Sequence, residues 1–338
     1  MIYGFDIFAG ICDDVAFKIL GDSKGKLSQH KFDLPANNPV RRIMVNYSFR
    51  QYFLWMTVSA GVLAVGKETV DIEFAKEPDF SVLDEKFKIY LAEIIGENTA
   101  ERLPRLRDWG LHIMRYGMDI KAPHINELMR VFAKTEIPKE HLKANQAATM
   151  LPPYDYPWHN GKLEIYPKAE LLKAGRIEYK EAKGDYPTED SRDMIRLVLV
   201  HKRGDMGHAR RIMKKFEMDT WRLESYLNPL VVTNVFMKAY LDLVGGGDFY
   251  TYEKALEIIE NKVPNRQNRQ TLIELTDNIN EKGTVAKARA MSADKKKFKR
   301  DLKLLNDTGI NGAFLNPNAE FARIENPIDE IIEKCRVY

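Results

Sequence analysis

Cysteine is scarce in this chain. Its 338 residues include only two cysteines, Cys12 and Cys335, which lie near opposite ends. Two thiols so far apart in sequence provide neither a disulfide framework nor the spacing of a Cys-based metal site, and this usage is typical of a reducing cytoplasm. We therefore expect a cytoplasmic protein that is held together by a hydrophobic core, for which 44% hydrophobic residues are sufficient.

Long hydrophobic runs are also missing. The most apolar stretch, residues 52–65, is short and is interrupted by Ser59 and Gly61. It cannot cross a bilayer, and the first residues lack the basic and then apolar pattern of a signal peptide, so we expect no membrane partner. Repeats and low-complexity segments are absent too. The length and composition indicate an ordinary globular protein with room for two domains.

A strong excess of one charge is absent from the chain as a whole, but the charge is unevenly distributed. The net charge is +3, whereas residues 262–303 contain 12 Lys or Arg against 5 Asp or Glu. A basic region on a nearly neutral body indicates a polyanionic partner. The alternative interpretation is a solvated, lysine-rich helix face, and the charge count alone does not separate the two.

Hydrophobic periodicity predicts an α+β protein. Alternating or β-branched segments predict strands at residues 43–47, 51–58, 62–65, 70–74, 111–120, 162–168 and 194–202. Helical periodicity predicts helices at residues 81–95 and 125–132, and it dominates beyond residue 216. We expect an antiparallel sheet with helices on one face in residues 1–217, followed by a basic helical domain in residues 218–338.

One strand carries an unusual set of side chains. In residues 162–168, Glu164, Tyr166 and Lys168 alternate with apolar residues, so the two-residue period of a strand places them on one side of the sheet. Pro167 cannot donate to a sheet ladder, which predicts that Tyr166 lies at a strand end or sheet edge, within reach of a large substrate. The alternative is a half-buried tyrosine on an amphipathic strand.

The order of several short motifs resembles that of the replication initiators of filamentous phages, the gene II/X family, and of their plasmid and prophage versions. The motifs are Ile113-Met114-Arg115-Tyr116-Gly117-Met118-Asp119-Ile120, Tyr166-Pro167-Lys168, the strand from Arg196 to Arg203, Gly247-Asp248-Phe249-Tyr250, and the segment from Leu305 to Ile310. Together they extend over most of the chain. The resemblance implies a nuclease layer like that of HUH nucleases and relaxases.

Proteins of that family start rolling-circle replication. They nick an origin strand, remain linked to its 5′ phosphate through a tyrosine and later rejoin the ends, with a divalent cation at the phosphate. The resemblance implies that Tyr166 is the nucleophile and that Mg²⁺ or Mn²⁺ is the cofactor, with Asp119 and Glu164 as ligands. Lys168 is the expected catalytic cation, because a nearby ammonium could lower the pKa of a phenol or steady the phosphate; Lys202 could do the same.

The expected partner is therefore DNA at a replication origin, and the resemblance also implies contacts with a host helicase and polymerase. The residues that we expect to bind DNA are basic ones on the last predicted strand and on the basic helix: Arg196, Lys202, Arg203, Lys295, Lys296, Lys297, Lys299 and Arg300.

Two positions depart from the family pattern. Arg115 stands where relatives commonly have an aspartate, and Val198 stands where many have a glutamate. A His-hydrophobe-His pair, the metal motif of related nickases, is absent. The leading hypothesis remains a nicking and joining initiator. The alternatives are a DNA-binding regulator or origin-recognition factor of the same ancestry that no longer cuts, and a scaffold whose basic helices contact an acidic protein.

Overall fold

The computed structural model describes residues 2–21, 29–34, 38–65, 80–135, 154–158, 161–169, 193–202 and 207–336. Its main sheet has eight strands in the order β2-β3-β4-β1-β5-β8-β7-β6, and every neighbouring pair is antiparallel. The strands are β1 (Ile2–Ile11), β2 (Gln29–Asp33), β3 (Val40–Ser48), β4 (Gln51–Ser59), β5 (Gly110–Lys121), β6 (Tyr154–Trp158), β7 (Gly161–Pro167) and β8 (Met194–Lys202). The predicted α+β class and antiparallel sheet are confirmed.

The helices fall into two groups. Those packed near the sheet are α1 (Asp13–Leu20), α2 (Ala60–Val65), α3 (Phe80–Ile95), α4 (Glu97–Ala100), α5 (Ile125–Phe132), α7 (Gly207–Lys215), α8 (Leu223–Leu227), α9 (Pro229–Leu243) and α14 (Ile328–Arg336), with a 3-10 turn at Leu106–Asp108. The second group is α10 (Tyr252–Lys262), α11 (Arg266–Lys282), α12 (Val285–Met291) and α13 (Lys295–Asp307). A small ribbon of β9 (Phe249–Tyr250) and β10 (Arg323–Ile324) joins the groups.

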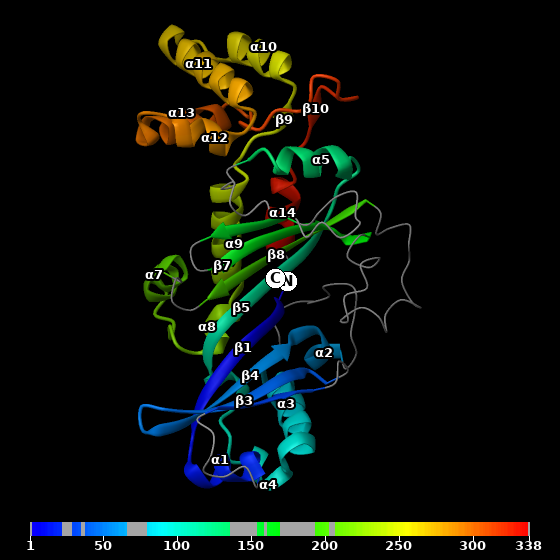
Figure 1. Ribbon diagram of the computed structural model, residues 1–338, viewed down its shortest axis with the longest axis vertical. Coiled ribbons are helices and arrows are strands. Elements are labelled where there is room, and N and C mark those ends of the chain that lie inside the picture. The colour runs from blue at the N-terminus through cyan, green and yellow to red at the C-terminus, as the bar shows by residue number, and fades with distance from the viewer. Residues whose placement is uncertain are drawn as a thin grey trace.

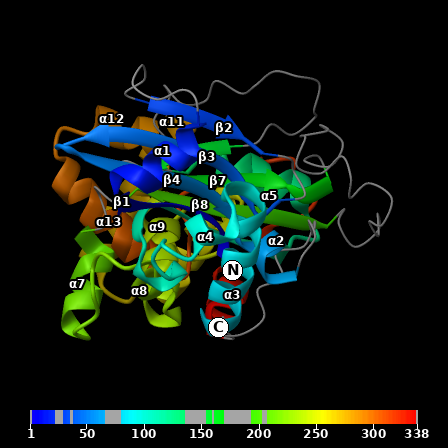
Figure 2. The ribbon, with the colours of Figure 1, turned by 90° about the horizontal axis from the view of Figure 1, so that it is seen from below.

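The two faces of the sheet differ because side chains alternate along each strand. On β1, Phe5 and Ile7 are buried in the main core, whereas Asp6 points to the opposite face. Helices α3, α8 and α9 lie on one side of the strands (Figure 2) and contribute to that core. The opposite face carries the polar and charged residues that the sequence singled out.

A second core lies within α10 to α13, which form one end of the elongated molecule (Figure 1). Apolar residues of α8, α9 and α14, by contrast, belong to the core under the sheet. Helices α8, α9 and α14 therefore pack with the sheet, and the domain boundary predicted near residue 217 stays a prediction. Val231, Val235 and Phe236 of α9 are fully buried against the sheet layer.

One predicted strand is wrong. Residues 62–65 belong to the helix α2, and Val62 and Leu63 are buried beside β1. A short apolar run bounded by glycines fits a buried helix as well as a strand, so its periodicity cannot decide between them. The strand predicted at residues 70–74 lies outside the described residues. The remaining predicted strands and helices in the described part of the chain are confirmed.

Candidate functional site

Strands β5, β8 and β7 bring together four residues that are far apart in sequence. In the register of these strands Tyr166 lies opposite Arg196, and Arg196 lies opposite Asp119. Arg196 donates to both carboxylate oxygens of Asp119, from Nε at 2.7 Å and from Nη2 at 2.9 Å. The Nζ atom of Lys168 lies 2.7 Å from Oδ2 of the same aspartate. Lys168 follows β7 directly, so it continues the face that carries Tyr166.

This polar cluster is buried. Arg196 is 0% exposed and Lys168 is 2% exposed. Burial by itself would raise the pKa of Asp119, but the hydrogen bond and charge of Arg196, together with the charge of Lys168, outweigh it and lower the pKa. Asp119 therefore stays ionised at neutral pH, and its carboxylate neutralises a cation that the fold has taken out of water.

Asp119 and Glu164 were the predicted metal ligands. Both oxygens of Asp119 accept contacts from Arg196 and Lys168, and the carboxylate of Glu164 lies 2.5 Å from Nζ of Lys162. Within the described ranges, no group of three His, Cys, Asp or Glu side chains is placed to hold a metal ion. These two carboxylates contact the protein's own cations, and their role as ligands of Mg²⁺ or Mn²⁺ stays a prediction.

Tyr166, the predicted nucleophile, lies at a strand end, as expected, but it is not accessible. It is the second-last residue of β7, and its side chain is 5% exposed. Tyr166 does not lie at a sheet edge, because β7 pairs with β8 on one side and with β6 on the other. A phosphate could contact the hydroxyl only after the structure around Tyr166 opens.

The two departures from the family pattern have clear structural roles. Arg115 forms a two-pronged ion pair with Asp6 of β1, at 2.8 and 3.2 Å. Val198 is a buried residue of β8, opposite Glu164 on one side and Gly117 on the other. The role of Asp6 has no local signal in the sequence, because its partner is 109 positions away.

The basic residues expected on β8 are divided. Arg196 is paired with Asp119 inside the protein, and its contact with DNA stays a prediction. Lys202 is exposed at the end of β8. Arg203 lies outside the described residues. Of the basic residues expected on β8, Lys202 is thus the one that the described part of the chain places at the surface.

A second site lies where the two cores meet. A groove of about 990 Å³ runs between the C-terminal end of α9, helices α12 and α13, and the loop that follows α9. Its charged lining contains six cations and two carboxylates: Lys238, Arg289, Lys296, Lys299, Arg300, Lys303, Asp242 and Asp307. The groove is therefore strongly positive.

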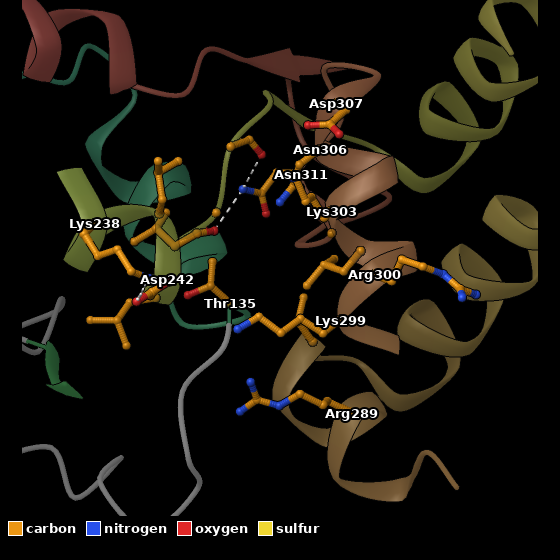
Figure 3. A pocket seen from close by; sticks show the side chains of 18 of the residues that line it. Thr135, Lys238, Asp242, Arg289, Lys299, Arg300, Lys303, Asn306, Asp307 and Asn311 are labelled. Carbon is orange, nitrogen blue, oxygen red and sulfur yellow. Dashed lines mark hydrogen bonds and ion pairs between the residues drawn. The ribbon is translucent and has the colours of Figure 1, made fainter. Parts of the chain in front are cut away.

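The charges of the groove are not equivalent. Lys238 is paired with Asp242 at 2.5 Å, and Arg300 donates to Asp301 and points away from the groove (Figure 3). Lys299 and Arg289 extend across the groove toward α9 in the same view. Within the part of the chain that the structure describes, Lys299 has no ion pair. Its ammonium group is therefore available to an anion in the groove.

The predicted DNA-binding residues of α13 separate into two sets. Lys296, Lys299 and Arg300 line the groove, whereas Lys295 and Lys297 are exposed elsewhere on the helix. Lys303, a basic residue of the same helix that was not among the predicted DNA-binding residues, completes the stripe. Positions 296, 299 and 303 have the spacing of one helical face, opposite the buried Phe298 and Leu305. The helical periodicity of the sequence could therefore have predicted this basic stripe. Lys238 and Arg289 come from other helices and had no such signal.

The wall of the groove is a loop whose backbone is fixed by side-chain amides. Asn311 donates to the carbonyls of Val244 and Gly246, at 2.9 and 3.1 Å. Asn326 donates to the carbonyls of Gly245 and Gly247, at 3.1 and 2.8 Å. These four bonds satisfy carbonyl groups that would otherwise be left open at the end of α9, so the groove is a preformed site.

Comparison of the chain with protein-family models, with curated proteins and with solved structures found no match in any of the three. In the described residues, none of the helices is long and apolar enough to cross a membrane.

Proposed function

We propose that this protein binds DNA through the groove between α9 and α13. The observation that supports this function is the stripe formed by Lys296, Lys299 and Lys303, which faces a concave surface with a net positive lining. Lysines are compact, well-hydrated point charges that bind backbone phosphates without reading a base sequence. A stripe of them along one helix face suits an extended polyanion better than a small anion, because the charges are spread along about two turns.

Salt dependence of binding tests this proposal. A fluorescein-labelled duplex should bind the wild-type protein with an affinity that falls linearly on logarithmic axes as salt increases, because phosphate contacts release counterions. Each phosphate contact that is lost reduces by about 1 the slope of the logarithm of the binding constant against the logarithm of the salt concentration. The double variant Lys299→Gln and Lys303→Gln should therefore flatten the slope by about 2 and weaken binding roughly 10- to 30-fold near 0.15 M salt.

A matched control is available on the same helix. Lys295→Gln combined with Lys297→Gln removes the same charge from exposed positions outside the groove. We expect this control to bind DNA almost as tightly as the wild type. Equal losses in the two double variants would show that net charge matters and the groove does not, and that result would refute the proposal.

A second candidate is the rolling-circle initiator, which nicks and rejoins an origin strand through Tyr166. It is favoured by the placement of Tyr166 opposite Arg196 and close in sequence to Lys168, because cations near a phenol favour the phenolate. Its expected partners remain a replication origin and the host helicase and polymerase. This activity requires the buried cluster to open, so we rank it below DNA binding without cutting.

Incubation with a labelled single-stranded oligonucleotide and Mn²⁺, followed by a denaturing gel, separates the two candidates. A nicking enzyme gives a labelled band at protein size, and Tyr166→Phe abolishes that band while leaving duplex binding intact. An adduct that survives in Tyr166→Phe would exclude Tyr166 as the sole nucleophile. Binding without any adduct would leave DNA recognition as the function.

A further inference from the structure

The turn between β3 and β4 has an unusual backbone for its sequence. Ser48 pairs with Gln51, so Phe49 and Arg50 alone form the turn, and both have positive φ, at 51° and 62°. This is the arrangement of a type I′ hairpin, whose two central positions are normally Asn-Gly, Asp-Gly or Gly-Gly. A bulky residue with positive φ is an outlier, and such outliers are concentrated at functional sites.

The strain is combined with extreme exposure. The side chain of Phe49 is 94% exposed, and Tyr47 beside it is 49% exposed. Behind them the hairpin is firmly packed, since the ring of Tyr52 lies 4.8 Å from that of Tyr47 and 5.7 Å from that of Phe17 on α1. The fold therefore holds an aromatic ring in solvent at the end of a rigid hairpin, although an Asn-Gly turn would serve the hairpin better.

Basic side chains lie on the same side of the molecule as this turn, although Asp13 and Asp14 of α1, the helix packed against the hairpin, are exposed as well. In both overall views the turn, helix α7 and helix α13 lie along the same side of the molecule (Figures 1 and 2). Helix α7 exposes Arg211, Lys214 and Lys215 on that stretch, and Arg50 is exposed in the turn itself. A polyanion bound in the groove of α13 and continuing past α7 would reach the turn. The positive charge favours a polyanion such as DNA over a neutral or basic partner at this place.

We propose that Phe49 stacks on a base of DNA bound along this basic side and separates it from its neighbour, while Arg50 contacts the adjacent phosphate. The inference rests on the proposed DNA binding and adds to it a residue that distorts the DNA. Aromatic rings stack on bases of any sequence, and apolar side chains that enter a base step unstack it. The left-handed turn projects the ring beyond the last strand pair, where it can reach a base.

A duplex that carries 2-aminopurine provides the test, because the fluorescence of this base rises when it loses its stacking partner. Wild-type protein should raise the fluorescence severalfold at one position of the duplex. Phe49→Asn should abolish that rise and weaken binding about tenfold, since the contribution of one stacked base is lost. Phe49→Tyr should retain both properties, because the ring is kept.

Stability separates a functional ring from a structural one. The double variant Phe49→Asn and Arg50→Gly has Asn-Gly, the favoured pair of a type I′ turn. The melting temperature of this variant should rise above that of the wild type, while the fluorescence signal is lost. A fall in melting temperature would show that the pair supports the hairpin and would overturn the inference. Ile89→Ala, which alters a 54% exposed apolar residue on α3, is the control and should change neither property.

The failure of this inference and the failure of the proposed function give different results. If Phe49→Asn still raises the 2-aminopurine fluorescence as the wild type does, the proposed role of the turn is refuted. If the Lys299→Gln and Lys303→Gln variant loses binding in the same experiments, the proposed role of the groove still stands. Wild-type protein that binds no duplex would refute both. Binding of the wild type to anionic lipid vesicles that Phe49→Asn abolishes, without a DNA signal, would assign the turn to a membrane surface and would overturn its role in DNA binding.

Discussion

Replacing Asp119 by asparagine should destabilise the sheet layer strongly. The carboxylate accepts three contacts of 2.7 to 2.9 Å from Arg196 and Lys168, which are 0% and 2% exposed. The amide would leave these two cations buried beside a neutral group. Loss of one partner from a buried ion pair costs about 3–5 kcal/mol. At about 2–4 °C per kcal/mol, the melting temperature should fall by roughly 10 °C.

Thermal unfolding followed by circular dichroism measures this effect, and the chain provides a comparison. Asp6→Asn breaks the ion pair with Arg115, whose side chains are 17% and 26% exposed. Solvent screens this pair better, so its loss should cost only about 1 kcal/mol. A fall for Asp119→Asn no larger than that for Asp6→Asn would refute our view of the cluster as a structural ion pair.

The pH dependence gives an independent check of the same reasoning. The pKa of Asp119 is lowered in the folded state, so its contribution to stability is present above the unfolded value of 3.8 and is lost as the pH falls through the folded value. The stability difference between wild type and Asp119→Asn should thus be constant from pH 5 to 7 and should shrink only at more acidic pH. If Asp119 served only as a metal ligand, the result would differ: without metal, the Asp119→Asn variant would be as stable as the wild type or more stable.

Two further predictions concern other parts of the fold. Gly247 has φ of 76°, and a Cβ there would lie 2.6 Å from the carbonyl carbon of Ile310, so Gly247→Ala should lower the melting temperature by several degrees in a thermal scan; an unchanged value would show that this contact can relax. Burial raises the pKa of the Cys335 thiol to about 12, so a thiol reagent at pH 8 should modify Cys12 alone in the folded protein and both cysteines in denaturant; two reactive thiols in the folded protein would contradict the burial of Cys335.

Local patterns predicted the elements of this fold well because they depend on neighbours in sequence. Thr251 caps α10 and Gly283 ends α11 with φ of 76°, as their residue types indicate. The alternation in β7 correctly placed Glu164 and Tyr166 on one face. Burial depends on what packs against that face. The sequence pattern of β7 does not predict its pairing with β6 or the cations that surround Asp119. The placement of the residues could thus be predicted, but their accessibility could not.

The same distinction explains why half of the groove was missed. The basic stripe of α13 is a local pattern, but the groove needs α9, which belongs to the other core. The two cores are joined at residues 244–248, where Asn311 and Asn326 bind four backbone carbonyls. Because these amides fix the loop, Lys299 faces α9 before any ligand arrives, and binding need not spend free energy on ordering the wall. Weakening this loop should therefore reduce DNA affinity even though no lysine changes.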